Sequence, residues 1–144
     1  MHPFPHRYQV QASATPDGDV PISAPRMPTL QTAPPVEFDG PGDRWSPESL
    51  LCAAVADCFV LSFRAVAKAS KFEWRALACD VEGTLNRVEG KSFFTHFVVK
   101  ARLQVPAGID RERATRLLEK SEQVCLISSS LVAERKVEAT IEFV

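Results

Sequence analysis

Cysteine and histidine are the residue types that we consider first as nucleophiles and metal ligands. The cysteines are Cys52, Cys58, Cys79 and Cys125, and the histidines are His2, His6 and His96. The sequence contains no C-x-x-C pair of the kind that zinc sites use, so we predict no metal site. A cysteine thiolate can attack a peroxide and pass through a sulfenic acid. Burial in apolar surroundings makes a thiol inert, so the elements that hold each cysteine decide its chemistry.

The composition is typical of one ordinary globular domain. The chain has 144 residues, of which 45% are hydrophobic and 24% charged, and its net charge is −1. It has no basic surplus to neutralise phosphates, so nucleic acid is not an expected partner. No run approaches the roughly 18 to 20 apolar residues that span a bilayer, and no membrane partner is expected. Residues 1–8 are polar and contain proline, unlike a secretory signal, which favours a cytoplasmic protein.

A long helix is predicted to follow Ser46. Ser46 is a good N-cap, Pro47 suits the first helical position, and Glu48 places an acid in the first turn. Residues 50–69 contain no glycine or proline, and apolar side chains cover most of the circumference. Such a helix is typically buried. At about 24 residues it would be roughly 35 Å long. That is long for a domain of this size, so we expect part of it to pack on a second subunit.

Residues 1–47 hold ten of the eleven prolines, which excludes one long helix there. This segment is predicted to form a strand over residues 8–12, a turn over 16–19, a returning strand over 20–23 and an extended, irregular connection over 24–45.

The second half of the chain is predicted to combine strands with helices. Residues 76–88 and 92–104 have the pattern of a hairpin. A helix over 111 to about 123, a short second helix after Cys125 and a last strand over 137–143 follow. The fold class is therefore α+β. We expect a single domain over residues 1–144, with strands and the extended connection in 1–45 and helix, hairpin, helix and strand in 46–144.

Two stretches resemble signatures of the OsmC/Ohr family. Residues 46–59, SPESLLCAAVADCF, resemble its serine–proline–glutamate start, which leads into an apolar helix with a reactive cysteine ten residues after the glutamate. Here Glu48 and Cys58 have that spacing. Residues 119–128, EKSEQVCLIS, look like the element that carries the family's second cysteine, Cys125. The resemblance implies the OsmC-like fold, with antiparallel sheets around a long buried central helix in an intertwined homodimer.

The resemblance also implies thiol-dependent reduction of organic hydroperoxides without a cofactor. Cys58 would attack the peroxide and become a sulfenic acid, which Cys125 would resolve. A dithiol, such as a lipoylated protein, would return the electrons. Ten helical residues span about 15 Å, so we expect Glu48 to serve the partner's Cys58 rather than that of its own helix. Cys52 and Cys79 are expected to be packing residues.

One departure from the family leaves a second interpretation open. Peroxidase members carry an arginine near the turn of the N-terminal hairpin, but residues 13–18 read SATPDG. Because burial alone would raise the pKa of Cys58, we expect activity to require an imported cation, for which Arg26 is the candidate. Phe59 and Phe63 are candidates for an apolar substrate pocket. The alternative is a non-catalytic or weakly active OsmC-like stress protein that binds a small apolar ligand or senses redox state.

Overall fold

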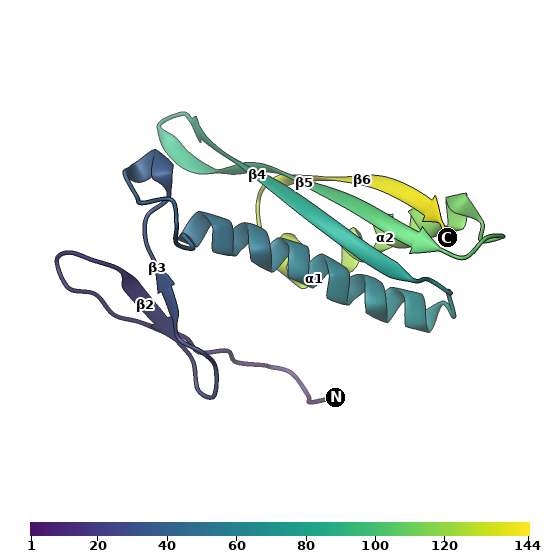
Figure 1. Cartoon of the computed structure of the whole chain (residues 1–144), viewed down its shortest axis with the longest axis horizontal. Coiled ribbons are helices and arrows are strands. Elements are labelled where there is room, and N and C mark those ends of the chain that lie inside the picture. Colours follow the sequence, from purple (N-terminus) through teal and green to yellow (C-terminus); the bar gives the residue numbers. More distant parts are fainter. The chain divides into compact units, whose positions relative to one another are not determined.

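A computed structural model describes all residues, 1–144, as two compact units, Met1–Leu51 and Cys52–Val144 (Figure 1). The boundary lies close to the division expected between residues 45 and 46. That the two form one domain over 1–144 stays a prediction.

The first unit contains a small antiparallel sheet. Strand β1 (Gln11–Ala12) pairs with β2 (Val20–Ser23), and β2 pairs with β3 (Leu30–Thr32). Gly18 has φ 93° in the turn between β1 and β2, as that turn requires. The predicted hairpin is therefore present, although β1 is shorter than expected. The segment expected to be irregular instead contains β3 and a 3₁₀ helix, η1 (Val36–Phe38).

Helix α1 (Pro47–Ala69) begins at the predicted residue. The Ser49 backbone N–H donates to Ser46 Oγ at 3.1 Å, and the Ser46 N–H donates to Ser49 Oγ at 2.8 Å. These two bonds form a reciprocal cap that satisfies backbone donors at the start of the helix. The cap, with Pro47 at the first helical position, fixes where the helix starts and hence which face carries Cys58.

The second unit contains a three-stranded sheet in the order β4-β5-β6. Strands β4 (Ala76–Val88) and β5 (Lys91–Val105) form the predicted hairpin, closed by Glu89 and Gly90 with φ 51° and 79°. Strand β6 (Glu134–Phe143) runs parallel to β5. The sheet is thus mixed rather than purely antiparallel, because helices α2 (Arg111–Val124) and α3 (Leu126–Ser129) form the crossover that a parallel pair needs.

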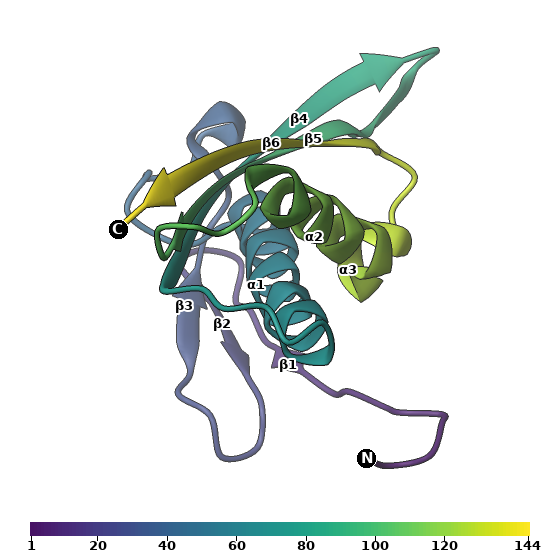
Figure 2. The same ribbon diagram turned by 90° about the vertical axis from the view of Figure 1, so that its right-hand side faces the viewer.

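Helices α1 and α2 cover the same face of this sheet (Figure 2). The Asp110 side chain accepts a hydrogen bond from the Glu112 backbone N–H at 3.0 Å and caps α2, as expected. From Phe97 to Val105, every second residue of β5 is buried. The largest fully buried apolar side chains of the core are Phe59, Phe63, Phe97, Leu103, Leu118, Val55, Val99 and Val105. The predicted α+β class is confirmed.

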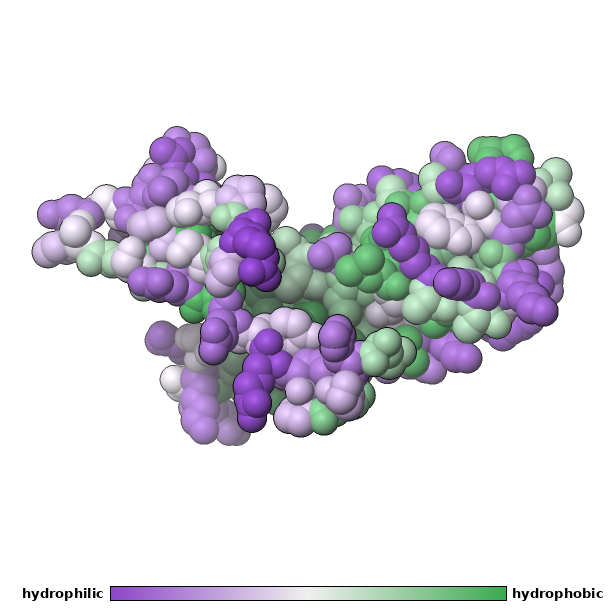
Figure 3. Space-filling model, turned by 90° about the horizontal axis from the view of Figure 1, so that it is seen from below, coloured by the Kyte–Doolittle hydropathy of each residue, from purple (hydrophilic) through white to green (hydrophobic).

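Helix α1 is more apolar than expected, since no stretch of the sequence was predicted to be long and apolar enough to span a bilayer. An 18-residue window has a mean hydropathy of 1.9, long and apolar enough to cross a membrane by length and composition alone. Core helices of globular proteins share this property, and Phe63 of α1 packs edge-on against Phe72 and Trp74. Only 28% of the window is buried, so much of the apolar helix surface lies open in the single chain. Figure 3 shows apolar atoms, in green, exposed among hydrophilic ones.

Candidate thiol site

Cys58 lies at the border between the buried and the open side of α1. The next residue, Phe59, is completely buried in the core. One residue corresponds to about 100° around a helix, so the Cys58 thiol points to one side of the core face. There it borders an open cavity of about 650 Å³. The cavity is lined mainly by apolar residues: Ala54, Asp57, Cys58, Leu61, Ser62, Ala65, Val124, Leu126 and Ile127.

Cys125 stands at the junction between α2 and α3. Its backbone is extended, with φ −63° and ψ 114°, so one helix ends and the next begins at this residue. The side chain is fully buried, at 0% exposure, and Ser128 Oγ donates a hydrogen bond to its sulfur at 3.3 Å. Each thiol influences the other: Cys125 lowers the pKa of Cys58 and Cys58 raises the pKa of Cys125, so the two lie near each other, and both are free thiols. The fold thus brings together two cysteines that only the family resemblance had linked.

The surroundings of Cys58 favour its thiolate. Burial is the strongest single influence and opposes ionisation. It is outweighed by hydrogen bonds from the Ile127 backbone N–H, the Cys125 thiol, the Ser62 hydroxyl and the Leu126 backbone N–H, so the pKa of Cys58 is lowered. The single chain thus favours the thiolate through hydrogen bonds, and that activity requires an imported cation stays a prediction. Hydrogen bonds to a charged group favour that charge as a nearby cation does.

Cys125 has the opposite tendency. Burial raises the pKa of its thiol, hydrogen bonds from Ser128 oppose that rise, and the neighbouring Cys58 adds to it. The pair therefore consists of an easily ionised thiol at the cavity and a protonated thiol behind it. A lowered pKa is what an attacking cysteine needs, because the thiolate is the nucleophile.

The other two cysteines lie apart from the cavity. Cys52 packs against β4, and a β-carbon added at Gly83 would lie 2.8 Å from Cys52 Sγ. Burial raises the pKa of Cys52, a shift that a hydrogen bond with the Gly83 backbone reduces. Burial and the charge of Asp80 are the first causes that raise the pKa of Cys79 to about 11. Both thiols are protonated near neutral pH, in keeping with a packing role.

The structure does not join the remaining sequence candidates to this cavity. Glu48 belongs to the first turn of α1, and its Oε2 is buried without a hydrogen-bond partner. Helix α1 is unbroken from Pro47 to Ala69, so Glu48 and Cys58 are separated by about 15 Å of helix. Arg26 is exposed in the first unit, with φ 64° and no salt bridge. Phe59 and Phe63 are both at 0% exposure in the core and do not line the cavity.

Sequence reasoning missed four contributors to the site. Ser62 lies four residues after Cys58, on the same helix face, at 3.9 Å from its sulfur. Ser128 follows Cys125 by three residues in the next short helix. Helical spacing could have indicated both serines. The backbone N–H groups of Leu126 and Ile127 carry no side-chain signal and become visible only in the fold.

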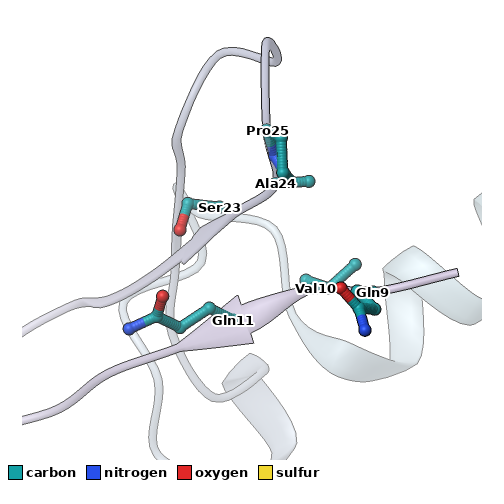
Figure 4. A pocket seen from close by; sticks show the side chains of 6 residues that line it. All are labelled: Gln9, Val10, Gln11, Ser23, Ala24 and Pro25. Carbon is teal, nitrogen blue, oxygen red and sulfur yellow. The ribbon is translucent and has the colours of Figure 1, made fainter.

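A second cavity, of about 620 Å³, lies in the first unit (Figure 4). Its lining residues are Gln9, Val10, Gln11, Ser23, Ala24 and Pro25. None of these side chains is acidic, basic or nucleophilic at neutral pH. This cavity therefore offers no candidate for acid–base or thiol chemistry.

A model of the OsmC-like protein family matches residues 40–141, a range that includes Glu48, Cys58 and Cys125. The chain therefore belongs to the OsmC/Ohr family, as the two sequence stretches indicated.

Individual relatives agree with this assignment. The uncharacterized protein YmaD of Bacillus subtilis is 30% identical over an alignment of 115 residues, and the match covers 75% of this chain and 75% of that one. An OsmC-like protein of unknown function from Vibrio cholerae superposes with a TM-score of 0.84 at 13% identity, covering 94% of this chain and 99% of that one. The organic hydroperoxide resistance protein OsmC of Legionella pneumophila gives 0.72 at 24% identity, with coverage of 95% and 97%. These solved structures share the fold.

Proposed function

We propose that this chain is a thiol-dependent peroxidase that reduces organic hydroperoxides with Cys58 and Cys125. The observation that carries the proposal is the neighbouring pair: a Cys58 thiol with a lowered pKa, open to an apolar cavity, and a buried Cys125 close to it. The name of the similar Legionella protein, an organic hydroperoxide resistance protein, supports the same substrate class.

The reaction proceeds in two steps. The Cys58 thiolate attacks the distal oxygen of ROOH, the O–O bond breaks, and the alkoxide leaves as ROH after taking up a proton. Cys58 is oxidised to a sulfenic acid and the peroxide is reduced. The Cys125 sulfur then attacks the Cys58 sulfur, the S–O bond breaks, and water leaves as a disulfide forms. An external dithiol, such as a lipoylated protein, reduces the disulfide.

The cavity favours a peroxide with an apolar body. Its walls are mostly aliphatic, and Asp57 is the one charged residue among them. Burying apolar surface of the substrate is favourable by about 25 cal/mol per Å². A hydroperoxide with an aromatic or alkyl group gains this contact, whereas hydrogen peroxide does not. We therefore expect organic hydroperoxides to react faster than hydrogen peroxide.

A homodimer belongs to this proposal. Much of the apolar surface of α1 is open in the single chain, and open apolar faces of this kind usually mark an interface. The buried and unpartnered Glu48 Oε2 calls for a donor that the single chain does not provide. In the proposed dimer, the helices of two copies pack together and Glu48 serves the partner's Cys58.

Single-turnover oxidation of the reduced protein tests the proposal. One equivalent of cumene hydroperoxide or hydrogen peroxide is added, free thiols are counted, and disulfides are mapped by mass spectrometry. We expect fast loss of two thiols and a Cys58–Cys125 bridge, with no reaction in Cys58→Ser. Cys79→Ser is the matched control and should react like the natural chain. Survival of all four thiols in excess peroxide for minutes would overturn the proposal.

The alternative is a weakly active stress protein that binds a small apolar ligand or senses redox state. The lack of an arginine near residues 13–18, together with the open apolar cavity, favours it. Binding of an apolar probe that Leu61→Asp abolishes, combined with inert thiols, would support a ligand-binding protein. A Cys58–Cys125 bridge that forms once but is not turned over by dithiols would support a sensor.

A further inference from the structure

Ser62 is the one side chain lining the cavity, apart from Cys58 itself, that has a proton to donate in a hydrogen bond at neutral pH. The other lining side chains are aliphatic, except Asp57, whose carboxylate only accepts. Ser62 lies one turn after Cys58 on α1, and its Oγ is 3.9 Å from Cys58 Sγ. A negative charge that develops on an oxygen in this cavity therefore has Ser62 as its side-chain donor.

The Ser62 hydroxyl is directed differently from other hydroxyls on the helices of this chain. Thr115 and Ser121 of α2 donate to the carbonyl oxygen four residues earlier, at 3.0 Å and 2.6 Å. The Ser62 hydroxyl faces the sulfur of the residue four positions earlier instead of its carbonyl. There it contributes to the lowered pKa of Cys58. A hydroxyl that is not bound to the helix backbone can turn toward an acceptor in the cavity.

A hydroperoxide can reach the sulfur and the hydroxyl at the same time. Attack needs an oxygen about 3 to 3.5 Å from the sulfur, and a hydroxyl donates to an oxygen over about 2.7 to 2.8 Å. The sum of these two distances exceeds the 3.9 Å between Cys58 Sγ and Ser62 Oγ, so one oxygen can contact both groups. The second peroxide oxygen, one bond farther from the sulfur, also lies within reach of the hydroxyl.

We propose that Ser62 is a catalytic residue of peroxide reduction, whose hydroxyl donates a hydrogen bond to the peroxide oxygen that leaves as the alkoxide. The inference rests on the proposed function of Cys58. The thiolate sulfur bonds to the distal oxygen, which keeps its proton, so Cys58 becomes a sulfenic acid. The O–O bond breaks, and its electron pair goes to the oxygen that carries the organic group. This alkoxide takes a proton from water, which the open cavity admits, and the products are the alcohol and a hydroxide ion.

The hydroxyl stabilises the transition state more than it stabilises the resting thiolate. Its acceptor before the reaction is a sulfur 3.9 Å away, and sulfur is a weak acceptor. As the O–O bond breaks, the negative charge moves to an oxygen, and hydrogen bonds to an oxygen anion are short and strong. Only an interaction that is stronger in the transition state accelerates the reaction. No lysine, arginine or histidine lines the cavity to share this charge.

Three reagents separate this role from an effect on the ionisation of Cys58. Cumene hydroperoxide expels a strongly basic alkoxide, peracetic acid expels a weakly basic carboxylate, and iodoacetamide alkylates the thiolate without an oxygen leaving group. The rate constant for modification of Cys58 is measured by quenching and mass spectrometry, from neutral pH to the alkaline plateau where Cys58 is fully ionised. The variants are Ser62→Ala and Ser62→Thr, which keeps a hydroxyl. Thr115→Ala is the matched control, because it removes a helical hydroxyl that bonds to a backbone carbonyl.

On the alkaline plateau we expect Ser62→Ala to slow the reaction with cumene hydroperoxide by about tenfold, less than the roughly hundredfold or more that a donor in a closed oxyanion hole contributes. Peracetic acid should be slowed less and iodoacetamide not at all. Ser62→Thr and Thr115→Ala should react like the natural chain. Equal slowing with all three reagents, an unchanged rate with cumene hydroperoxide, or a Ser62→Thr rate as low as that of Ser62→Ala would overturn the role of Ser62. A natural chain whose Cys58 reacts with iodoacetamide but with neither oxidant would instead refute the proposed function.

Discussion

Gly83→Ala tests how tightly α1 packs on the sheet, and hence how firmly the Cys58 face is held. A methyl group at this position of β4 would lie 2.8 Å from Cys52 Sγ, 2.8 Å from Phe97 Cε1 and 3.1 Å from Phe94 Cε1. Phe97 is 1% exposed and its ring stacks on Phe94, so neither ring can move away freely. Overpacking of this kind costs about 1 to 3 kcal/mol.

A smaller opposing effect comes from the unfolded chain. Replacing glycine by alanine restricts the unfolded state and stabilises a protein by about 0.4 to 1 kcal/mol where the backbone is compatible. The net expectation is a loss of about 1 to 2 kcal/mol in the free energy of unfolding. Urea denaturation measures it, with a slope of about 1 to 3 kcal/mol per molar urea for proteins of this size.

Cys52→Ala provides the matched background, because it removes the sulfur that the new methyl group would meet. In that background Gly83→Ala should cost at least about 0.5 kcal/mol less, as residues in contact typically couple by this amount or more. Equal costs in both backgrounds, or no cost in the natural chain, would refute the packing assigned to Cys52 and α1.

Two further predictions concern the thiols. Leu126→Pro deletes one N–H donor to Cys58, at a position that tolerates proline because Cys125 before it is extended. We expect the pKa of Cys58 to rise, which is measured from the pH dependence of its alkylation rate. Leu126→Ala keeps the N–H donor and should leave the pKa unchanged. The pKa of Cys79 is raised to about 11, so this thiol contributes stability that is fully present below its unfolded pKa of about 8.5 and is lost as the pH rises through about 11. Cys79→Ala should therefore flatten the alkaline fall in the free energy of unfolding measured with urea. An unchanged slope would contradict the raised pKa of Cys79.

The strong local signals predicted the elements of this fold well. The start of α1 was visible in Ser46 and Pro47, because capping and proline chemistry act within one turn. The hairpin of β4 and β5 was visible in its alternation and its turn. The parallel pairing of β6 with β5 was not, because the direction of a strand depends on where the crossover delivers the chain. Strand β3 was missed since three residues carry too little pattern.

The site was predictable only in part. Cys58 and Cys125 were selected by family resemblance, and in the fold each influences the pKa of the other. The aromatic candidates were misplaced because Phe59 follows Cys58 directly and so points about 100° away from it around the helix. A helical projection anchored on Cys58 would have selected Leu61 and Ser62 for the cavity instead.

The prediction of a cation beside Cys58 illustrates what sequence reasoning leaves out. It considered side chains, and the side chains around Cys58 offer no positive charge among the cavity residues. The fold stabilises the thiolate instead with backbone N–H groups at the start of α3, which every residue except proline carries. Leu126 and Ile127 appear in the sequence as apolar residues, yet their amides, not their side chains, favour ionisation of Cys58. A chain can therefore lose a charged side chain from such a site and keep an ionisable thiol, provided that Cys125 still separates the two helices.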